Sequence, residues 1–433
     1  MPGEGRRTSA RAHRMPRAVI ALGLAGVLTG ACVSRTPADP AREGMAAPDG
    51  GVTWPALEAT GNARLSPPGP GPHPILIVGH GVEERRLVNH AAMVLATITD
   101  RRETGEGVLL DLAIQRRPRE PTYAVAPART LEYRFASPSL FWAMKGKGQQ
   151  LRVEQAPWSG EPVDSVNFQM LEPLGGREAR GLIVCFHSLG GLTYERAVLY
   201  ELQRRGWMLI VAEFPWDSGG SSVWDVEPAT AEGVGEKLAA GIDARLLRAG
   251  IAARAAREYL VETTPALAGR PTLVWGASAG SFAAPAVAER LRADAMVLVG
   301  SGANILAVAQ TSTFFDGGIL LRPRGVSERD GPRLIERVIE AYRDHARLDP
   351  HALAPHLVRV PTLMIHAGED EIVPAAEGET LWNRLGRPER WTLSCGHEML
   401  FWRLGSLAQD IADWVDRLPT RSDGGPGAPR PEK

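Results

Sequence analysis

Three side chains in the second part of the sequence have the chemistry of nucleophilic catalysis. Ser278 lies in the run Gly-Ala-Ser-Ala-Gly, Asp370 in the turn Gly-Glu-Asp-Glu-Ile-Val-Pro, and His397 in the run Cys-Gly-His-Glu. A serine hydroxyl is a weak nucleophile at neutral pH, so it needs a base within hydrogen-bond reach. That base in turn needs a carboxylate that fixes its tautomer. We therefore predict that His397 takes the proton of Ser278 and that Asp370 orients His397.

The position of the serine run supports this prediction. The run follows the apolar residues 272–275 and precedes a helical segment at 282–292. A serine on such a sharp strand-to-helix turn points outward, and its small neighbours permit the crowded backbone. In a chain with 47 glycines the run alone is weak evidence, and its flanking elements strengthen it.

Short apolar runs alternate with helical segments from about residue 166 onward. Apolar runs without polar alternation are typical of strands that are buried on both faces of a parallel sheet. We therefore predict an α/β fold with a doubly wound, mostly parallel sheet, whose ligands bind at the carboxyl ends of the strands. The predicted strands are 181–186, 208–212, 272–275, 295–299 and 362–365, and the predicted helices are 194–205, 231–259, 282–292 and 404–418.

Over about residues 166–418 the chain resembles the α/β-hydrolase superfamily. The order serine, acid, histidine is the order of that fold. The strand followed by Asp-x-Ile-Val-Pro resembles its acid turn, and Gly-His-Glu resembles its histidine loop. His187-Ser-Leu-Gly-Gly191 resembles its oxyanion loop, with Ser188 in place of a glycine. The resemblance implies that the backbone N–H groups of Leu189 and Ala279 form the oxyanion hole.

Several other residues imitate functional groups. His80-Gly81 also resembles an oxyanion loop but lies far upstream of the serine run. Glu369 and Glu371 flank Asp370, and we interpret both as solvated turn carboxylates. We expect His366 to be a structural histidine at a strand end. Cys395 lies close to His397, and we interpret it as a buried, inert cysteine rather than a nucleophile.

The first residues have the layout of an export signal. Arginines between residues 6 and 17 precede an apolar run at 18–28, which is too short to cross a membrane as a helix. The end of this segment resembles the lipobox of bacterial lipoproteins, in which a cysteine is acylated and becomes the mature N-terminus. Cys32 occupies that position, and Thr29 stands where the family usually has a branched apolar residue. The alternative is cleavage without lipidation, which would give a periplasmic or secreted protein.

Composition and motifs divide the chain further. A segment rich in Pro, Gly and Ala predicts a flexible tether that holds the enzyme off the membrane. The next region is an accessory N-terminal region with a possible helix from Leu87 to Ile98. Within the hydrolase part, one interval interrupts the alternation of strands and helices, and we predict that it forms a cap. The predicted divisions are 1–32 signal, 33–73 tether, 74–161 accessory region, 162–418 hydrolase domain with a cap at 302–359, and 419–433 disordered tail.

Charge and cysteine usage exclude several classes of protein. The formal net charge of −1 gives no general attraction to nucleic acid, and three cysteines without paired spacing give neither a metal site nor a disulfide framework. We expect no cofactor and no metal. The sequence thus predicts a serine hydrolase that cleaves a small-molecule carboxylic ester, is exported, and is held at the bacterial cell envelope by a lipid anchor. The alternatives are a peptidase of the same fold and a ligand-binding lipoprotein without turnover. The sequence does not indicate an oligomeric state.

Overall fold

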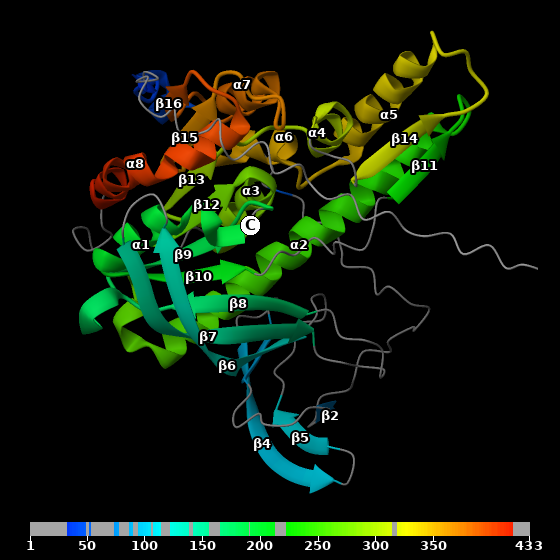
Figure 1. Ribbon diagram of the computed structural model, residues 1–433. Helices are drawn as coiled ribbons and strands as arrows, with labels where there is room; N and C mark the ends of the chain where they lie inside the picture. Colours follow the sequence, from blue (N-terminus) through cyan, green and yellow to red (C-terminus); the bar gives the residue numbers. More distant parts are fainter. Residues whose placement is uncertain are drawn as a thin grey trace, which may run out of the picture.

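The apolar runs of the sequence are strands of one sheet in a computed structural model of the chain (Figure 1). β9 (Gly181–Phe186) and β13 (Ala295–Val299) have the predicted bounds. β10 (Trp207–Ala212), β12 (Thr272–Ala277) and β15 (Thr362–Ala367) are slightly longer than predicted. The structure describes residues 33–48, 52, 73–77, 86–89, 94–104, 107–113, 122–137, 142–155, 165–189, 191–212, 222–313 and 318–418.

The central strands are parallel and lie in the order β16 (Glu389–Leu393), β15, β13, β12, β9, β10. β8 (Ser165–Leu171) joins β10 in the antiparallel direction. The winding reverses at β9, because the chain continues to β10 on one side and returns to β12 on the other. The predicted doubly wound, mostly parallel sheet is thereby confirmed. The carboxyl ends of β9 and β12 form its topological switch point, the place where such sheets bind ligands.

Helices cover both faces of the sheet, which explains the apolar runs without alternation. Leu182, Val184 and Phe186 of β9 contribute to one core, and Ile183 and Cys185 contribute to the other. The first core also holds α2 (Ala231–Thr263) and α3 (Ala284–Leu291), and the second holds α1 (Arg196–Arg204) and α8 (His397–Asp416). α8 begins at His397 instead of the predicted Leu404, so the predicted base opens the helix.

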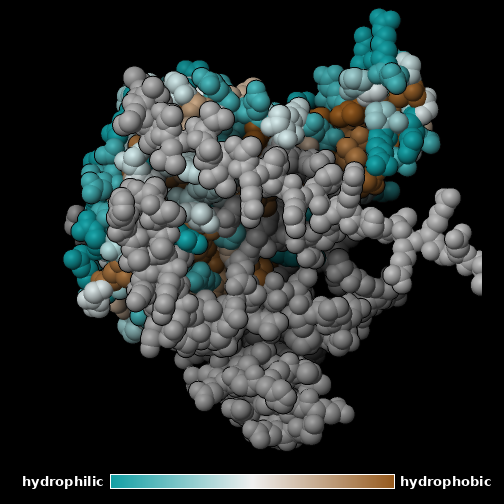
Figure 2. All heavy atoms as spheres, in the orientation of Figure 1, coloured by the Kyte–Doolittle hydropathy of each residue, from teal (hydrophilic) through white to brown (hydrophobic). Residues whose placement is uncertain are grey.

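The predicted cap is part of a larger unit. Within 302–359 lie β14 (Ile319–Pro323) and α5 (Gly331–His345), and β14 pairs in parallel with β11 (Ser222–Val226), which lies outside the predicted range. α5 packs along α2. Together with β11 and β14, α5 forms an arm that projects beyond the sheet (Figure 1). Figure 2 shows hydrophobic surface on the arm, where the paired residues Val223 and Leu320 are exposed.

The remaining helices are α4 (Ile305–Thr311), α6 (Pro350–Leu353) and α7 (Ala375–Arg384), with short 3-10 turns at Leu174–Gly176, Gly191–Thr193, Pro265–Leu267, Ser278–Phe282 and Ala354–Leu357.

The prediction of a flexible tether is wrong for residues 33–48. β1 (Val33–Thr36) pairs in the antiparallel direction with β16, so it closes that edge of the sheet. A 3-10 turn (Pro40–Gly44) follows, and the buried Arg42 donates to the carbonyl oxygen of Val360 at 2.6 Å. The composition of this segment is typical of a linker, but the unpaired backbone groups of an edge strand provide it with hydrogen-bond partners. The signal segment, most of the remaining tether and the tail after Leu418 lie outside the described residues.

The accessory region extends the same sheet. Its strands β7, β6, β3, β4, β5 and β2 follow β8 in that order, and all are antiparallel. The helix predicted from Leu87 to Ile98 is wrong, since two strands occupy this range. β-branched residues within Val94–Thr104 favour a strand where antiparallel partners are available. The bounds are β2 His73–Ile77, β3 Arg86–Asn89, β4 Val94–Thr104, β5 Gly107–Ala113, β6 Thr122–Ser137 and β7 Trp142–Gln155.

Candidate functional site

Ser278 lies directly after β12 in a backbone conformation that is rare for a residue with a side chain. Its φ is 50°, in the left-handed region. A Cβ on Gly280 would lie 2.3 Å from the carbonyl oxygen of Phe186, and a Cβ on Gly276 would lie 2.6 Å from the Cβ of Ala284. Both glycines are therefore required for close packing of the turn against β9 and α3. The strand-to-helix turn that the sequence predicts is present, and its strained serine is held by the surrounding packing.

The fold brings together the three residues that the sequence singles out. The Ser278 Oγ lies 2.9 Å from the His397 Nε2, and the His397 Nδ1 lies 2.6 Å from the Asp370 Oδ2. The three side chains come from the carboxyl ends of β12, β15 and β16, which converge at one edge of the sheet. All three residues are buried. The imidazole thus has one nitrogen toward the hydroxyl and the other toward the carboxylate.

Backbone groups and neighbouring side chains fix this geometry. The Asp370 Oδ1 accepts hydrogen bonds from the N–H groups of Ile372 and Val373 at 3.0 and 2.8 Å. The other carboxylate oxygen is thereby directed at the imidazole. The ring of His397 lies against Phe401, with 4.9 Å between the centroids. Gly300, with a φ of 55°, lies so close that a Cβ there would be 2.9 Å from the His397 Cε1. The imidazole is therefore confined on several sides.

The predicted oxyanion residues lie at the switch point of the sheet. Leu189 belongs to the loop that follows β9, and Ala279 follows Ser278 in the turn after β12. The buried carboxylate of Glu195 holds this loop, because its Oε1 accepts from the backbone N–H of Ser188 at 2.9 Å. The ring nitrogen Nδ1 of His187 lies 2.6 Å from the carbonyl oxygen of Ser188. These two contacts fix the position of the loop directly beside Leu189.

Glu195 is a residue that sequence reasoning missed. In the sequence it reads as an ordinary acidic residue just before a helix, and its burial is not apparent from any pattern. Burial raises the pKa of the Glu195 carboxyl above its usual range, although hydrogen bonds from Ser188 act in the opposite direction. A carboxyl group inside the protein is costly unless it is hydrogen-bonded, so its bond to Ser188 is part of what permits it there.

Four of the residues that imitate functional groups lie in the described part of the chain. His366 is buried at the end of β15, and burial lowers its pKa. Burial likewise raises the pKa of the Cys395 thiol, which disfavours the thiolate. Glu369 and Glu371 are exposed beside the buried Asp370. His80-Gly81 and Cys32 lie outside the described residues.

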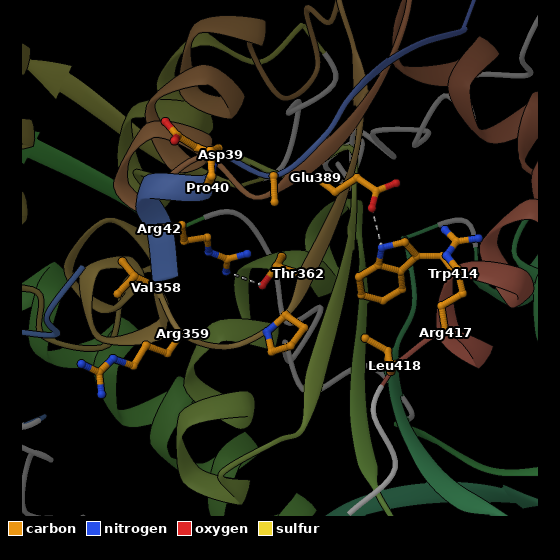
Figure 3. Close-up of a pocket in the computed structure, with 12 residues that line it drawn as sticks. Asp39, Pro40, Arg42, Val358, Arg359, Thr362, Glu389, Trp414, Arg417 and Leu418 are labelled. Atoms are coloured by element: carbon orange, nitrogen blue, oxygen red, sulfur yellow. Dashed lines mark hydrogen bonds between the residues drawn. The ribbon is translucent and has the colours of Figure 1, made fainter. Parts of the chain in front are cut away.

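A cavity of about 700 Å³ lies at the other end of the strands (Figure 3). Residues before and at the amino ends of β15 and β16 line it, together with the end of α8 and the turn that holds Arg42. Trp414 donates to the carboxylate of Glu389 at 2.9 Å, and Arg42 donates to the hydroxyl of Thr362 at 3.5 Å. Burial lowers the pKa of Arg42 to about 10. This cavity shares no residue with the Ser278 site, and its contacts attach the N-terminal segment to the domain.

Two further features concern only the described part of the chain. No group of three or more His, Cys, Asp and Glu residues there is arranged to hold a metal ion. None of its helices combines the length and the apolar composition that crossing a bilayer needs.

Several solved structures that are similar to this chain are esterases. No family model matches the chain, and no curated protein does. A polyethylene-glycol-bound esterase from an Arctic intertidal metagenomic library is 16% identical with a TM-score of 0.40, covering 66% of this chain and 97% of that chain. Est1E from Butyrivibrio proteoclasticus is 14% identical with a TM-score of 0.36, covering 59% and 94%. The esterase domain of a Rhodothermus marinus protein is 16% identical with a TM-score of 0.35, covering 62% and 98%. Because these identities and TM-scores are low, the fold assignment rests on the strand order. The candidate site is identified by the distances between its own residues.

Proposed function

We propose that the chain is a serine hydrolase that cleaves carboxylic esters through an acyl-enzyme on Ser278. The observation that carries the proposal is the continuous contact from the Ser278 hydroxyl through the His397 imidazole to the Asp370 carboxylate. Each group is within the distance that proton transfer needs. The strained turn that holds Ser278 supports the same role, because such a turn directs the serine hydroxyl away from the backbone and toward the base.

In the first half of the reaction His397 acts as a base and then as an acid. Its Nε2 takes the proton of the Ser278 hydroxyl while the oxygen attacks the ester carbonyl carbon. The resulting imidazolium is stabilised by Asp370. When the tetrahedral intermediate collapses, the alcohol oxygen leaves with the proton from Nε2, and the acyl group remains on Ser278. Water then attacks the acyl-enzyme by the same route, which releases the acid and restores the hydroxyl.

The negative charge of the tetrahedral intermediate requires hydrogen-bond donors beside Ser278. In the proposal these are the backbone N–H groups of Leu189 and Ala279, which come from the loops after β9 and β12. Preorganised backbone donors cost no reorientation during the reaction. Removing one such donor typically lowers turnover by about 100-fold to 1,000-fold.

A fluorophosphonate probe tests the proposal directly, since it reacts with activated serine hydroxyls. The parent chain should become labelled, and Ser278→Ala should not. Ser406→Ala is the matched control, because it removes an exposed hydroxyl from α8 and should leave labelling unchanged. A folded parent chain that stays unlabelled would refute catalysis and favour the ligand-binding alternative. Turnover of short-chain nitrophenyl esters against peptidyl amides then separates an esterase from a peptidase.

We also propose that the mature chain begins at an acylated Cys32 and is held at the cell envelope. The support is the sequence alone: basic residues, an apolar run and a cysteine after Gly30 and Ala31. One acyl chain anchors weakly, so stable residence needs more than one chain or a further contact with the bilayer. Mass analysis of the N-terminal peptide tests this, and an unmodified peptide beginning at another residue would contradict it.

A further inference from the structure

Large apolar side chains are exposed around the segments that carry the proposed catalytic groups. Among the described residues, four of the seven exposed large hydrophobic side chains lie after β9 or on the first turns of α8. We call these four the rim: Leu189, Tyr194, Met399 and Trp402, of which Trp402 is 66% exposed. Single exposed apolar residues are ordinary, whereas a group of them at one place is typical of a binding surface.

The aromatic side chains of the rim are continuous with the site. The ring of Tyr194 lies 6.2 Å from that of Trp402 and 6.2 Å from that of Phe401. Phe401 in turn lies 4.9 Å from the imidazole of His397. Apolar and aromatic groups therefore extend from the proposed base to the solvent at the carboxyl edge of the sheet.

The chain enters the folded domain at this same edge. β1 runs antiparallel to β16, and Val33 is paired with Leu393 at the carboxyl end of β16. His397 follows Leu393 by a short loop, and Cys32 directly precedes Val33. Val33 therefore places the start of the described chain at this edge of the sheet. In Figure 1 the first described residues, drawn in blue, lie beside the strand labelled β16.

We propose that the rim contacts a lipid bilayer, so that the edge bearing Ser278 faces the membrane and acts on esters that partition into it. In this arrangement, which rests on the proposed hydrolase and its acylated Cys32, the attachment point and the rim hold one side of the domain to the lipid. It replaces the expectation of a tether that keeps the enzyme off the membrane.

The chemistry of the rim favours lipid as the occupant. Tyr and Trp side chains are enriched at the interface between bilayer and water, where the ring is apolar and its polar atom stays hydrated. The same turns of α8 also carry Glu398 and Arg403, whose opposite charges give no preference for anionic lipid. We therefore expect the rim to bind vesicles of phosphatidylcholine alone and to depend little on salt.

Site-directed fluorescence tests the orientation. A polarity-sensitive thiol label is placed on M399C, with L320C on the arm as the matched control, because both positions are similarly exposed. Cys185 and Cys395 are buried with raised thiol pKa values, and the parent chain without an added cysteine gives the background. On phosphatidylcholine vesicles the M399C label should shift to the blue and be quenched by a lipid-borne quencher. The L320C label should do neither.

A second measurement uses the unlabelled chain. Trp402→Ser should weaken vesicle binding about tenfold or more, since it removes one large apolar side chain from the interface. Leu320→Ser should not change it. Equal quenching of both labels, quenching of neither, or unchanged binding by Trp402→Ser would overturn the proposal. Dimers that Trp402→Ser disrupts, without lipid contact, would instead assign the rim to a second copy. None of these readouts involves turnover, so their failure is distinct from failure of the proposed hydrolase activity.

Discussion

The buried carboxylate of Glu195 accepts a hydrogen bond from the backbone N–H of Ser188, the residue next to Leu189. The loop that is proposed to bind the oxyanion is therefore positioned by a side chain that has no contact with substrate in the proposed reaction. In the proposal Glu195 positions the loop, whereas Ser278, His397 and Asp370 carry out the proton transfers and the attack. Replacing Glu195 should therefore have a different effect from replacing one of those three.

Replacing Glu195 tests whether its hydrogen bond or its charge matters. Glu195→Gln keeps an acceptor oxygen for Ser188, so kcat for a soluble ester should stay within a few-fold of the parent. Glu195→Leu leaves a buried N–H unpaired, which costs about 1–3 kcal/mol and lets the loop move. We expect Glu195→Leu to lower kcat by about 10-fold to 100-fold with little change in KM. An equal loss in both variants would show that the charge, and not the acceptor, is required.

Asp370→Asn should lower kcat by about 1,000-fold to 10,000-fold while the fold stays intact. The amide oxygen keeps the hydrogen bonds from Ile372 and Val373, but the NH₂ group then faces the His397 Nδ1 and favours the wrong tautomer. Glu371→Gln, an exposed neighbour on the same turn, is the control and should have little effect. If the two variants were equally impaired, Asp370 would lose its assignment as the orienting acid.

Gly280→Ala should destabilise the domain. A Cβ at this position would lie 2.3 Å from the carbonyl oxygen of Phe186, so the turn or β9 has to move, at a cost of about 1–3 kcal/mol. Gly241→Ala in α2 is the control, because its Cβ would meet nothing within 4 Å and alanine favours a helix by about 1 kcal/mol. Urea unfolding measures both. A Gly280→Ala variant as stable as the parent would contradict the close packing.

Asp349 should make the stability depend on pH between about 4 and 7. It is buried where α4, α5 and α6 meet, and it accepts from Tyr342 at 2.7 Å and from the backbone of Ile305 at 3.0 Å. Burial raises its pKa from 3.8 to about 7, although these hydrogen bonds oppose the shift.

The sign of this dependence follows from the raised pKa. Between pH 3.8 and about 7 the folded state keeps a proton that the unfolded state loses, so stability is full below this window and falls as pH rises through it. Within this window the titration of Asp349 lowers the free energy of unfolding by about 1.4 kcal/mol per pH unit. Asp349→Asn should remove this slope even though it weakens the hydrogen bonds. Denaturant unfolding across this pH range measures it, and an unchanged slope in the variant would assign the dependence to other groups.

The sequence allowed the central sheet and the three residues of the candidate site to be predicted, because both leave local signals. Strands such as β9 are apolar at every position since each face has its own core, and Ser278 lies in a turn that requires small neighbours. The strand at Val33–Thr36 and the burial of Glu195 were missed for a different reason. Whether Val33–Thr36 is a linker or a strand depends on an unpaired edge far away in the sequence, and burial of Glu195 depends on how a loop packs. Local patterns do not contain such information.

The pairing of β1 with β16 joins the first described strand of the chain to the last. The loop between them spans nearly the whole domain, so forming it carries a large entropic cost and comes late in folding. Val33–Thr36 has no partner on this edge until Glu389–Leu393 has been synthesised. However early Val33–Thr36 emerges, this edge of the sheet stays open until β16 has taken its place beside β15.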